Sequence, residues 1–259
     1  MKYSFLIILA IFLNLGLFSL GEFPVLNANQ EKSKFITNKV SSISDDIRTW
    51  KFITQIEIKE RIGNDLEKFP IKITLNLEDL ILNNKLEPDG SDLRFTTLSG
   101  NFLDFWIEND VNTNATDIWV EISLLKGNKT TIINMYYGNS EIESESDGTK
   151  VFDYFDGFED RNLNEYSTEI NGEVPYTVSD HDAYSGNFTL AIGPSSCGTS
   201  CFNNFQVKFN LNDIDLPDDY YEISYWRREP YDHGGETRVY VNGLQRYSKN
   251  GAPTWEDKG

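Results

Sequence analysis

The chain has 259 residues, of which 39% are hydrophobic and 14% aromatic, enough to build one large or two ordinary packed domains. It carries 41 acidic against 23 basic residues, for a formal net charge of −18. Such a surface repels phosphate backbones and anionic lipid headgroups, so the composition argues against nucleic acid as a partner and favours divalent cations or neutral ligands.

The first 21 residues have the pattern of a secretory signal peptide. Lys2 supplies a positive charge, and an almost unbroken apolar run from Phe5 to Leu20 precedes the small residue Gly21. An uncleaved membrane anchor is the alternative, but the run is shorter than the ~20 residues that a transmembrane helix needs. We predict a secreted or cell-surface protein with a signal peptide at 1–21 and no membrane span after its removal.

The next part of the chain changes from a polar segment to an alternating one. Residues 22–47 are polar and weakly patterned, and we expect a leader segment there. Beyond them, apolar and polar residues alternate in four segments, which predicts strands with one buried face: 52–59, 69–77, 118–124 and 133–137. A helical turn is expected only within 77–87. This spacing of short strands predicts an antiparallel β-sandwich domain over 48–139.

The second half of the chain is also β-rich. Residues 140–150 are acidic, have little apolar content and are predicted to be a linker. Strands are expected over 151–259 in "FTLAIG", "FQVKFNLND", "YEISYWRR" and "TRVYVNGLQRYS", the last with Asn242-Gly243 as a hairpin turn. Because the chain ends soon after this hairpin, we expect an incomplete domain of a longer protein. The predicted fold is all-β, with two antiparallel β-sandwich domains in tandem.

Two kinds of covalent modification are expected in an exported chain. Cys197 and Cys201 are predicted to form a disulfide that closes a small loop. Metal thiolates are the alternative, but such a site needs more ligands and the chain has only His181 and His233 to add. Sequons for N-glycosylation begin at Asn114, Asn128 and Asn187.

Two segments are candidates for binding. In "FDYFDGFED", residues 152–160, Asp156 and Glu159 are candidate ligands of a structural calcium ion, and a solvated acidic turn over packed phenylalanines is the alternative. The second segment is "YWRRE", residues 225–229, where an aromatic platform beside a guanidinium would suit a sugar or an acidic ligand. The alternative is that one aromatic belongs to the core and the arginines pair with local acids. The candidate binding residues are Tyr225, Trp226, Arg227 and Arg228.

Catalysis is not expected. The sequence contains no Gly-rich phosphate loop, no HExxH and no GxSxG, and neither histidine lies in a motif that would make it a general base. A glycosidase needs two carboxylates at a set separation, and nothing singles out two among 41 acidic residues.

Four segments in order resemble a known family. They are "DGSDLRFTTLSGNFLDFWIE", "ATDIWVEISLL", "INMYYGN" and "VFDYFDGFED". They resemble the domain of unknown function 2341 family, and the resemblance covers about residues 48–160. The residues that match its motifs are Asp92, Arg94 and Phe95, then Trp106, Ile107 and Glu108, then Trp119 and Val120, then Met135 to Asn139, and finally Phe155 to Glu159.

The resemblance implies an exported β-sandwich module of large prokaryotic surface proteins, often followed by a concanavalin A-like jelly roll and without known catalytic residues. Residues 151–259 resemble the first part of such a jelly roll, since "RVYVNGLQ" is similar to a strand–turn–strand of laminin-G-like sandwiches. The expected function is non-catalytic binding or adhesion, with glycans or surface proteins as partners. The alternatives are a structural spacer or envelope protein, and the non-catalytic N-terminal part of a larger polysaccharide-acting enzyme.

The hairpin at 89–108 combines carboxylates with aromatics. Both faces of its second strand, 102–107, are largely apolar, which predicts a strand between two packed layers with Trp106 substantially buried. Asp92 and Arg94 share a face, and we expect them to pair with each other or with Glu108. These charges are therefore interpreted as framing the fold.

Overall fold

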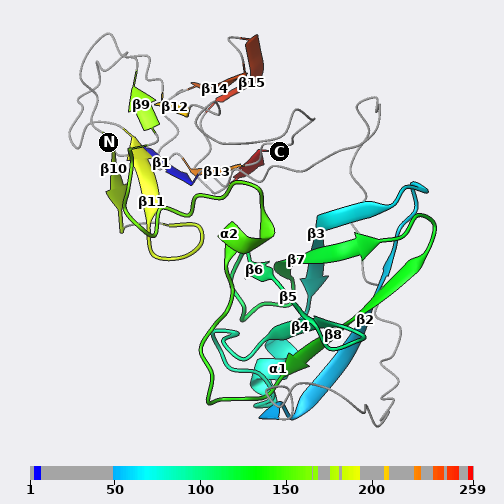
Figure 1. Ribbon diagram of the computed structural model, residues 1–259. Helices are drawn as coiled ribbons and strands as arrows, with labels where there is room; N and C mark the ends of the chain where they lie inside the picture. The colour runs from blue at the N-terminus through cyan, green and yellow to red at the C-terminus, as the bar shows by residue number, and fades with distance from the viewer. Residues whose placement is uncertain are drawn as a thin grey trace. The chain divides into compact units, whose positions relative to one another are not determined.

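The computed structural model describes residues 3–6, 49–164, 166–168, 176–180, 183–192, 207–209, 225–228, 236–241, 244–250 and 256–258 (Figure 1). Side chains are described in 49–164, 177–180 and 183–191. The chain divides into two compact units, one formed by Phe12–Asp153 and the other by Met1–Ile11 with Tyr154–Gly259.

The unit that contains residues 49–153 consists of two antiparallel sheets and two short helices. The first sheet has the order β2-β8-β4-β5, with β2 (Phe52–Lys59), β8 (Thr130–Tyr137), β4 (Arg94–Thr97) and β5 (Phe102–Leu103). The second has the order β3-β7-β6, with β3 (Leu66–Leu75), β7 (Thr116–Leu125) and β6 (Phe105–Ile107). The helices are α1 (Glu78–Leu82), where a helical turn was expected, and α2 (Gly148–Val151).

One hydrophobic core lies between these two sheets. Alternate residues of each strand contribute to it, such as Ile56 on β2 and Ile118 on β7, because successive side chains of a strand point to opposite faces. Phe95 of β4 and Phe105 of β6 meet with ring centroids 5.2 Å apart, which joins the two sheets directly. The alternation in the sequence therefore predicts most of the buried residues of the long strands correctly, but at the end of β7 Leu124 is 37% exposed and Leu125 is buried instead.

The strand expected over 102–107 is divided between the two sheets. Phe102 and Leu103 belong to the first sheet and pair with β4, whereas Phe105–Ile107 belong to the second and pair with β7. Trp106 is 6% exposed, so its predicted burial is confirmed, but it is not part of the core between the sheets. Phe102 is 44% exposed, so the expectation that both faces of this segment are packed is wrong.

β2 and β8 pair along their whole length, from Phe52 opposite Tyr137 to Lys59 opposite Thr130. The chain therefore enters the sandwich and leaves its last strand at the same end of this strand pair. The opposite end carries the β2–β3 turn and the β7–β8 hairpin. This placement brings residues near 50 and near 139 together, although almost ninety positions separate them (|i−j| = 90 for Thr49 and Asn139).

Gly138 turns the chain at the end of β8. Its φ of +89° is a left-handed conformation, and a Cβ on it would lie 2.6 Å from Cδ2 of Phe52. We expect Gly138→Ala to lower the free energy of unfolding by about 1–2 kcal/mol from backbone strain. Chemical denaturation of the two proteins measures this difference. Gly127, another glycine of this domain, cannot serve as a control, because a Cβ on Gly127 would lie 2.4 Å from the carbonyl oxygen of Gly63. An unchanged midpoint in Gly138→Ala would contradict the prediction.

The other unit is also formed by antiparallel strands. Its sheets have the orders β10-β11-β1-β13-β16, β12-β9 and β14-β15. The strands are β1 (Tyr3–Leu6), β9 (Tyr166–Thr168), β10 (Tyr176–Ser179), β11 (Thr189–Ile192), β12 (Val207–Phe209), β13 (Tyr225–Arg228), β14 (Glu236–Val241), β15 (Leu244–Asn250) and β16 (Glu256–Lys258).

Pairing of Val241 with Leu244 joins β14 to β15, as expected for a hairpin through residues 242–243. β1 falls within the predicted signal peptide, whose removal would take that strand out of its sheet. The regular secondary structure of the described residues is thus mostly β-strand, with few helices, and a jelly roll over 151–259 stays a prediction.

Candidate functional site

Asp92 lies at the centre of a polar network at the end of β2 and β8. It is fully buried, and each carboxylate oxygen accepts from main-chain amides: Oδ1 from Glu87 at 3.0 Å, and Oδ2 from Gly138 at 2.5 Å and Asn139 at 3.1 Å. Main-chain N–H groups thus satisfy both oxygens of this buried carboxylate. Asp92 therefore fixes the acidic turn before β4 to the chain that leaves β8.

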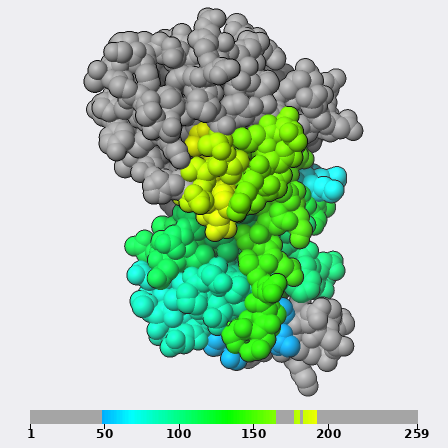
Figure 2. All heavy atoms as spheres, turned by 90° about the vertical axis from the view of Figure 1, so that its left-hand side faces the viewer, coloured from blue at the N-terminus to red at the C-terminus, as the bar shows by residue number. Residues whose placement is uncertain are grey.

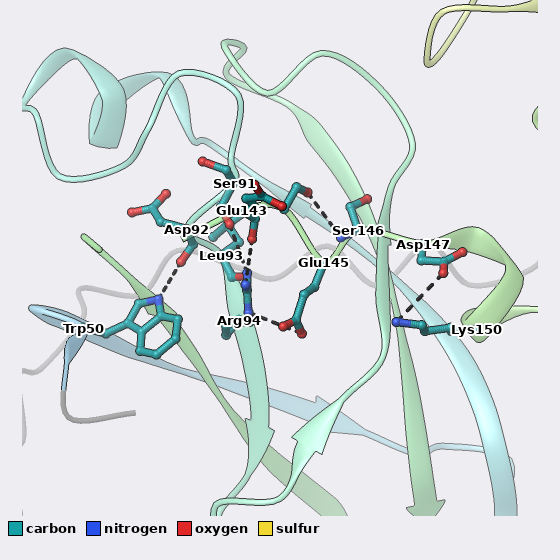
Figure 3. A network of polar contacts seen from close by, with 11 residues as sticks. Trp50, Ser91, Asp92, Leu93, Arg94, Glu143, Glu145, Ser146, Asp147 and Lys150 are labelled. Carbon is teal, nitrogen blue, oxygen red and sulfur yellow. Dashed lines mark hydrogen bonds and ion pairs between the residues drawn. The ribbon is translucent and has the colours of Figure 1, made fainter. Parts of the chain in front are cut away.

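Arg94 is the second charged residue of this network (Figure 3). It is 5% exposed, and its Nη1 donates to the carbonyl oxygens of Ser91 at 2.9 Å and Leu93 at 2.6 Å. Its Nη2 donates to the carbonyl oxygen of Glu143 at 2.7 Å, and its Nε lies 3.4 Å from the carboxylate of Glu145. Most of the bonds of this guanidinium thus go to main-chain groups.

The expected pairing of Asp92 with Arg94, or of either with Glu108, is not the observed one. Asp92 and Arg94 bind main-chain groups, and Glu108 forms an ion pair with Lys72 at 3.0 Å. Burial lowers the pKa of Arg94, and the charges of Glu145 and Asp92 oppose this effect. The charge of Asp92 therefore acts on that of Arg94, but the hydrogen bonds of Asp92, and most of those of Arg94, go to main-chain groups.

The network also holds the residues that enter the domain. Nδ2 of Asn139 donates to Oγ1 of Thr49 at 2.8 Å. Nε1 of Trp50 donates to the carbonyl oxygen of Asp92 at 2.7 Å (Figure 3). The guanidinium carbon of Arg94 lies 5.7 Å from the centre of the Trp50 ring. We call Thr49, Trp50, Asp92, Arg94 and Asn139 the hub, because it joins the entering chain to the leaving chain.

The segment after β8 is bound to the sandwich along its course. Oγ of Ser146 accepts from the amide of Ile107 at 2.8 Å, and the amide of Asp147 donates to the carbonyl oxygen of Phe105 at 2.9 Å. These bonds satisfy polar groups at the edge of the second sheet, where β6 is the last strand. We call residues 139–153 the strap. It includes the predicted linker 140–150, and Figure 2 shows green atoms of this part of the chain on the surface of the domain.

The strap ends on an aromatic cluster. The ring of Phe152 lies 5.9 Å from that of Trp106 and 5.3 Å from that of Trp119, in both cases near perpendicular. Lys72 lies over Trp119, with Nζ 4.9 Å from the ring centre, and Nε1 of Trp119 donates to Glu108 at 2.9 Å. Trp106 and Trp119 pair across β6 and β7 on the outer face of the second sheet, and Phe152 covers them.

Near this cluster, burial raises the pKa of two carboxylates. The pKa of Glu121 rises mainly through burial, with a further rise from the charges of Asp104 and Asp153, and burial also raises the pKa of Asp153. Lys68 lowers both values. It has a φ of +46°, and the β3–β7 register is the same on both sides of it, with Glu67 opposite Leu124 and Phe69 opposite Ile122.

We expect Glu121→Gln to stabilise the protein near neutral pH. A carboxylate whose pKa is raised by folding costs nothing below the pKa of the unfolded chain, and its cost grows as the pH rises through the folded-state pKa. The gain in the free energy of unfolding should therefore be largest at neutral pH and disappear in acid. Urea titrations over this range measure it, with Glu57→Gln, an exposed acid on β2, as control. A gain independent of pH would contradict this explanation.

Glu60 forms a similar clamp at the opposite end of β2. Its carboxylate accepts from the amides of Ile62, Gly63 at 2.8 Å and Asn128 at 2.7 Å, which ties the β2–β3 turn to the β7–β8 hairpin. Burial acts to raise the pKa of Glu60, but main-chain hydrogen bonds lower it below its usual value. This clamp stabilises the fold above the unfolded-state pKa and is lost as the pH falls through the folded-state pKa.

The two predicted calcium ligands are used by main-chain amides. Oδ1 of Asp156 accepts from the amide of Phe158 at 2.7 Å. Oε1 of Glu159 accepts from the amides of Asn187 at 2.8 Å and Phe188 at 3.0 Å, and its Oε2 accepts from Nδ2 of Asn187 at 3.1 Å. Among the residues with described placement, no group of three or more His, Cys, Asp or Glu is arranged to hold a metal ion. Calcium binding stays a prediction.

The other predicted sites are the three sequons, the disulfide and the aromatic-arginine segment. Of the sequons, Asn114 and Asn128 are exposed, and the side-chain nitrogen of Asn187, which would carry a glycan, is bonded to Glu159. The disulfide of Cys197 and Cys201 lies outside the described residues. The predicted ligand-binding residues form β13, of which only the backbone is described: Tyr225, Trp226, Arg227 and Arg228. A ligand site there stays a prediction.

These elements follow one another as the sequence motifs do: acidic turn, W-I-E strand, W-V strand, M-Y-Y-G-N strand and aromatic junction. Residues 89–169 match the family model of a domain of unknown function, DUF2341. No curated protein and no solved structure matches the chain. The DUF2341 match begins at the turn that holds Asp92 and includes Arg94, the aromatic cluster and the strap, whereas β2 and β3 precede it.

Sequence reasoning missed Glu60, Lys72, Thr49 and Trp50. The M-Y-Y-G-N motif was the available signal for part of the hub, because Gly138 and Asn139 supply the two amides that bind Asp92. Glu60 lies before the DUF2341 match and had no motif to mark it. In the part of the chain that the structure describes, no helix is long and apolar enough to cross a membrane.

Proposed function

We propose that this chain is an exported, non-catalytic surface module that acts in binding or adhesion, with glycans as the ligand class. The observation that carries the proposal is how the two charged residues of the D-x-R-F motif are hydrogen-bonded. Asp92 and Arg94 are both buried, and their hydrogen bonds go to main-chain groups of the same domain. Residues held in this way stabilise a scaffold and are not available to a substrate.

The aromatic residues of the motifs support the same interpretation. Trp106 is covered by Phe152, and Trp119 contacts Phe152, Lys72 and Glu108. A sugar-binding platform needs a free ring face, so this cluster serves packing. The ligand site of the proposal is therefore the β13 segment, Tyr225–Arg228, on the strength of its sequence.

A structural spacer within a larger surface assembly is the second candidate function. The observation that favours it is the hub, which joins the residues entering the domain to those leaving it. A module whose two ends are bonded to each other is suited to a place between other domains. This candidate requires no ligand.

Glycan-array binding by the full chain separates the two candidates. We expect binding to a defined set of glycans, and loss of that binding in Trp226→Ala, with Trp50→Phe as a control in the hub. A properly folded chain that binds no glycan would favour the spacer. Fractionation of the source cells tests export, and a chain found inside the cell would contradict both candidates. Release of reducing sugar from a polysaccharide would contradict the non-catalytic assignment.

A further inference from the structure

The position of the chain ends creates a mechanical weakness in the strand pair β2–β8. Phe52 lies opposite Tyr137, so the first residue of β2 and the last residue of β8 are neighbours. Tension applied to these two ends would separate the strands from that end, and the ladder bonds would break one after another. Antiparallel ladder bonds run perpendicular to the strands, so none would share the load with the next.

The hub crosses this point. Thr49 is bonded to Asn139, and Trp50 is bonded to the main chain of Asp92, whose carboxylate holds the amides of Gly138 and Asn139. These bonds lie just outside the β2–β8 ladder, on the side from which tension arrives. They must break before Phe52 and Tyr137 can separate.

The strap adds anchors on the leaving side. Tension applied from the C-terminal side first loads the contact of Phe152 with the aromatic cluster. It then loads the hydrogen bonds of Asp147 and Ser146 to β6, and after them the bond of Arg94 to Glu143. Each anchor uses different atoms: Phe152, Asp147 and Ser146 contact β6, and Glu143 contacts Arg94 of β4. The ladder end is therefore reached only after these contacts have opened.

We propose that the hub and the strap form a clasp that carries tensile load across the domain and protects the β2–β8 ladder from being opened at its end. The clasp rests on the proposed function as a surface module, since a module placed between other domains carries the tension that acts on them. Its charged members act by holding the entering chain to the leaving chain. Loss of a member should therefore weaken the domain far more under load than at rest.

Glu60 supplies a matched control within the same strand pair. Like Asp92 it is a buried carboxylate that accepts three main-chain N–H bonds, but it lies at the end of β2 away from the chain ends. Asp92→Asn and Glu60→Gln are both isosteric and both replace a charged acceptor. The two variants differ in position relative to the applied load.

The experiment holds the full chain by tags at its two ends in an optical trap at constant force. Unfolding of the sandwich is recognised by the release of residues 49–153, at about 3.3–3.6 Å per residue. We expect Asp92→Asn to unfold about tenfold faster than the parent chain at the same force, because charge-assisted bonds across the clasp are lost, and Glu60→Gln to stay within about threefold. Without load, denaturant-extrapolated unfolding rates of the two variants should be similar.

An equal increase in the unfolding rates of the two variants under load would overturn the clasp. An increase in each variant that is fully explained by its loss of equilibrium stability would overturn it as well. If Asp92→Asn does not fold, Asn139→Ala takes its place, because it removes the bond to Thr49 and keeps the amide that binds Asp92. That variant should also unfold faster under load, and an unchanged rate would count against the clasp. Failure of glycan binding or of export would refute the proposed function without changing these rates.

Discussion

Replacing Trp106 by alanine should lower the free energy of unfolding by about 3–5 kcal/mol, the usual cost of deleting a large buried aromatic. Trp106 is 6% exposed and lies under Phe152, so the deletion leaves a cavity beneath the end of the strap. Equilibrium denaturation in urea measures the loss. Phe102→Ala serves as control, because Phe102 lies four residues away and is half exposed.

The control should cost less than about 1 kcal/mol, since an exposed ring recovers little hydrophobic free energy on folding. Equal losses in the two variants would mean that Trp106, on the outer face of the second sheet, contributes no more to the free energy of unfolding than an exposed side chain does. Unchanged stability in Trp106→Ala, together with lost glycan binding, would make the aromatic cluster a binding surface. That result would also reverse the interpretation of the hairpin at 89–108.

The strands of the sandwich could be predicted because their alternation is a local property. The buried positions of β2, such as Ile56 and Ile58, follow directly from the period of two. The crossing of the chain at Asp104 could not be predicted in this way. Leu103 pairs with Phe95 and Phe105 pairs with Val120, and the identity of such partners depends on the whole topology.

The partners of Asp92 and Arg94 were beyond prediction for a related reason. Their sequence positions suggested charge pairing, but the atoms that bind them are main-chain amides and carbonyls, which every residue possesses. Gly138 lies 46 residues from Asp92, and Glu143 lies 49 residues from Arg94. Sequence patterns identify a charged side chain readily, and they say little about which distant backbone group reaches it.

The strap shows how composition can conceal attachment. The acidic residues of 140–150 suggested a solvated linker, and the side chains of Glu143 and Glu145 are indeed exposed. The contacts that bind this segment use the carbonyl oxygen of Glu143, the hydroxyl of Ser146 and the amide of Asp147. Exposed acidic side chains and a fixed backbone are therefore compatible, and only the first is visible in the sequence.

Replacing Arg94 by methionine should lower the free energy of unfolding by about 2–4 kcal/mol. Methionine keeps the apolar stem but removes the donor from three carbonyl oxygens, that of Leu93 in a buried bond and those of Ser91 and Glu143 in part-buried bonds. An orphaned buried acceptor costs about 1–3 kcal/mol, and a part-buried one costs less because water can reach it. Glu145→Gln is the matched test of the ion pair alone. The Glu145 side chain is 60% exposed, so this substitution should cost less than about 1 kcal/mol.

Urea denaturation at low and high salt distinguishes the two contributions of Arg94. The loss in Arg94→Met should be nearly independent of salt, because hydrogen bonds to neutral carbonyls are not screened, whereas any effect of Glu145→Gln should shrink as salt rises. A loss in Arg94→Met that matches Glu145→Gln and disappears in high salt would assign the role of Arg94 to the surface ion pair. The strap would then be held by charge at its edge, and the main-chain bonds of the hub would contribute little to its attachment.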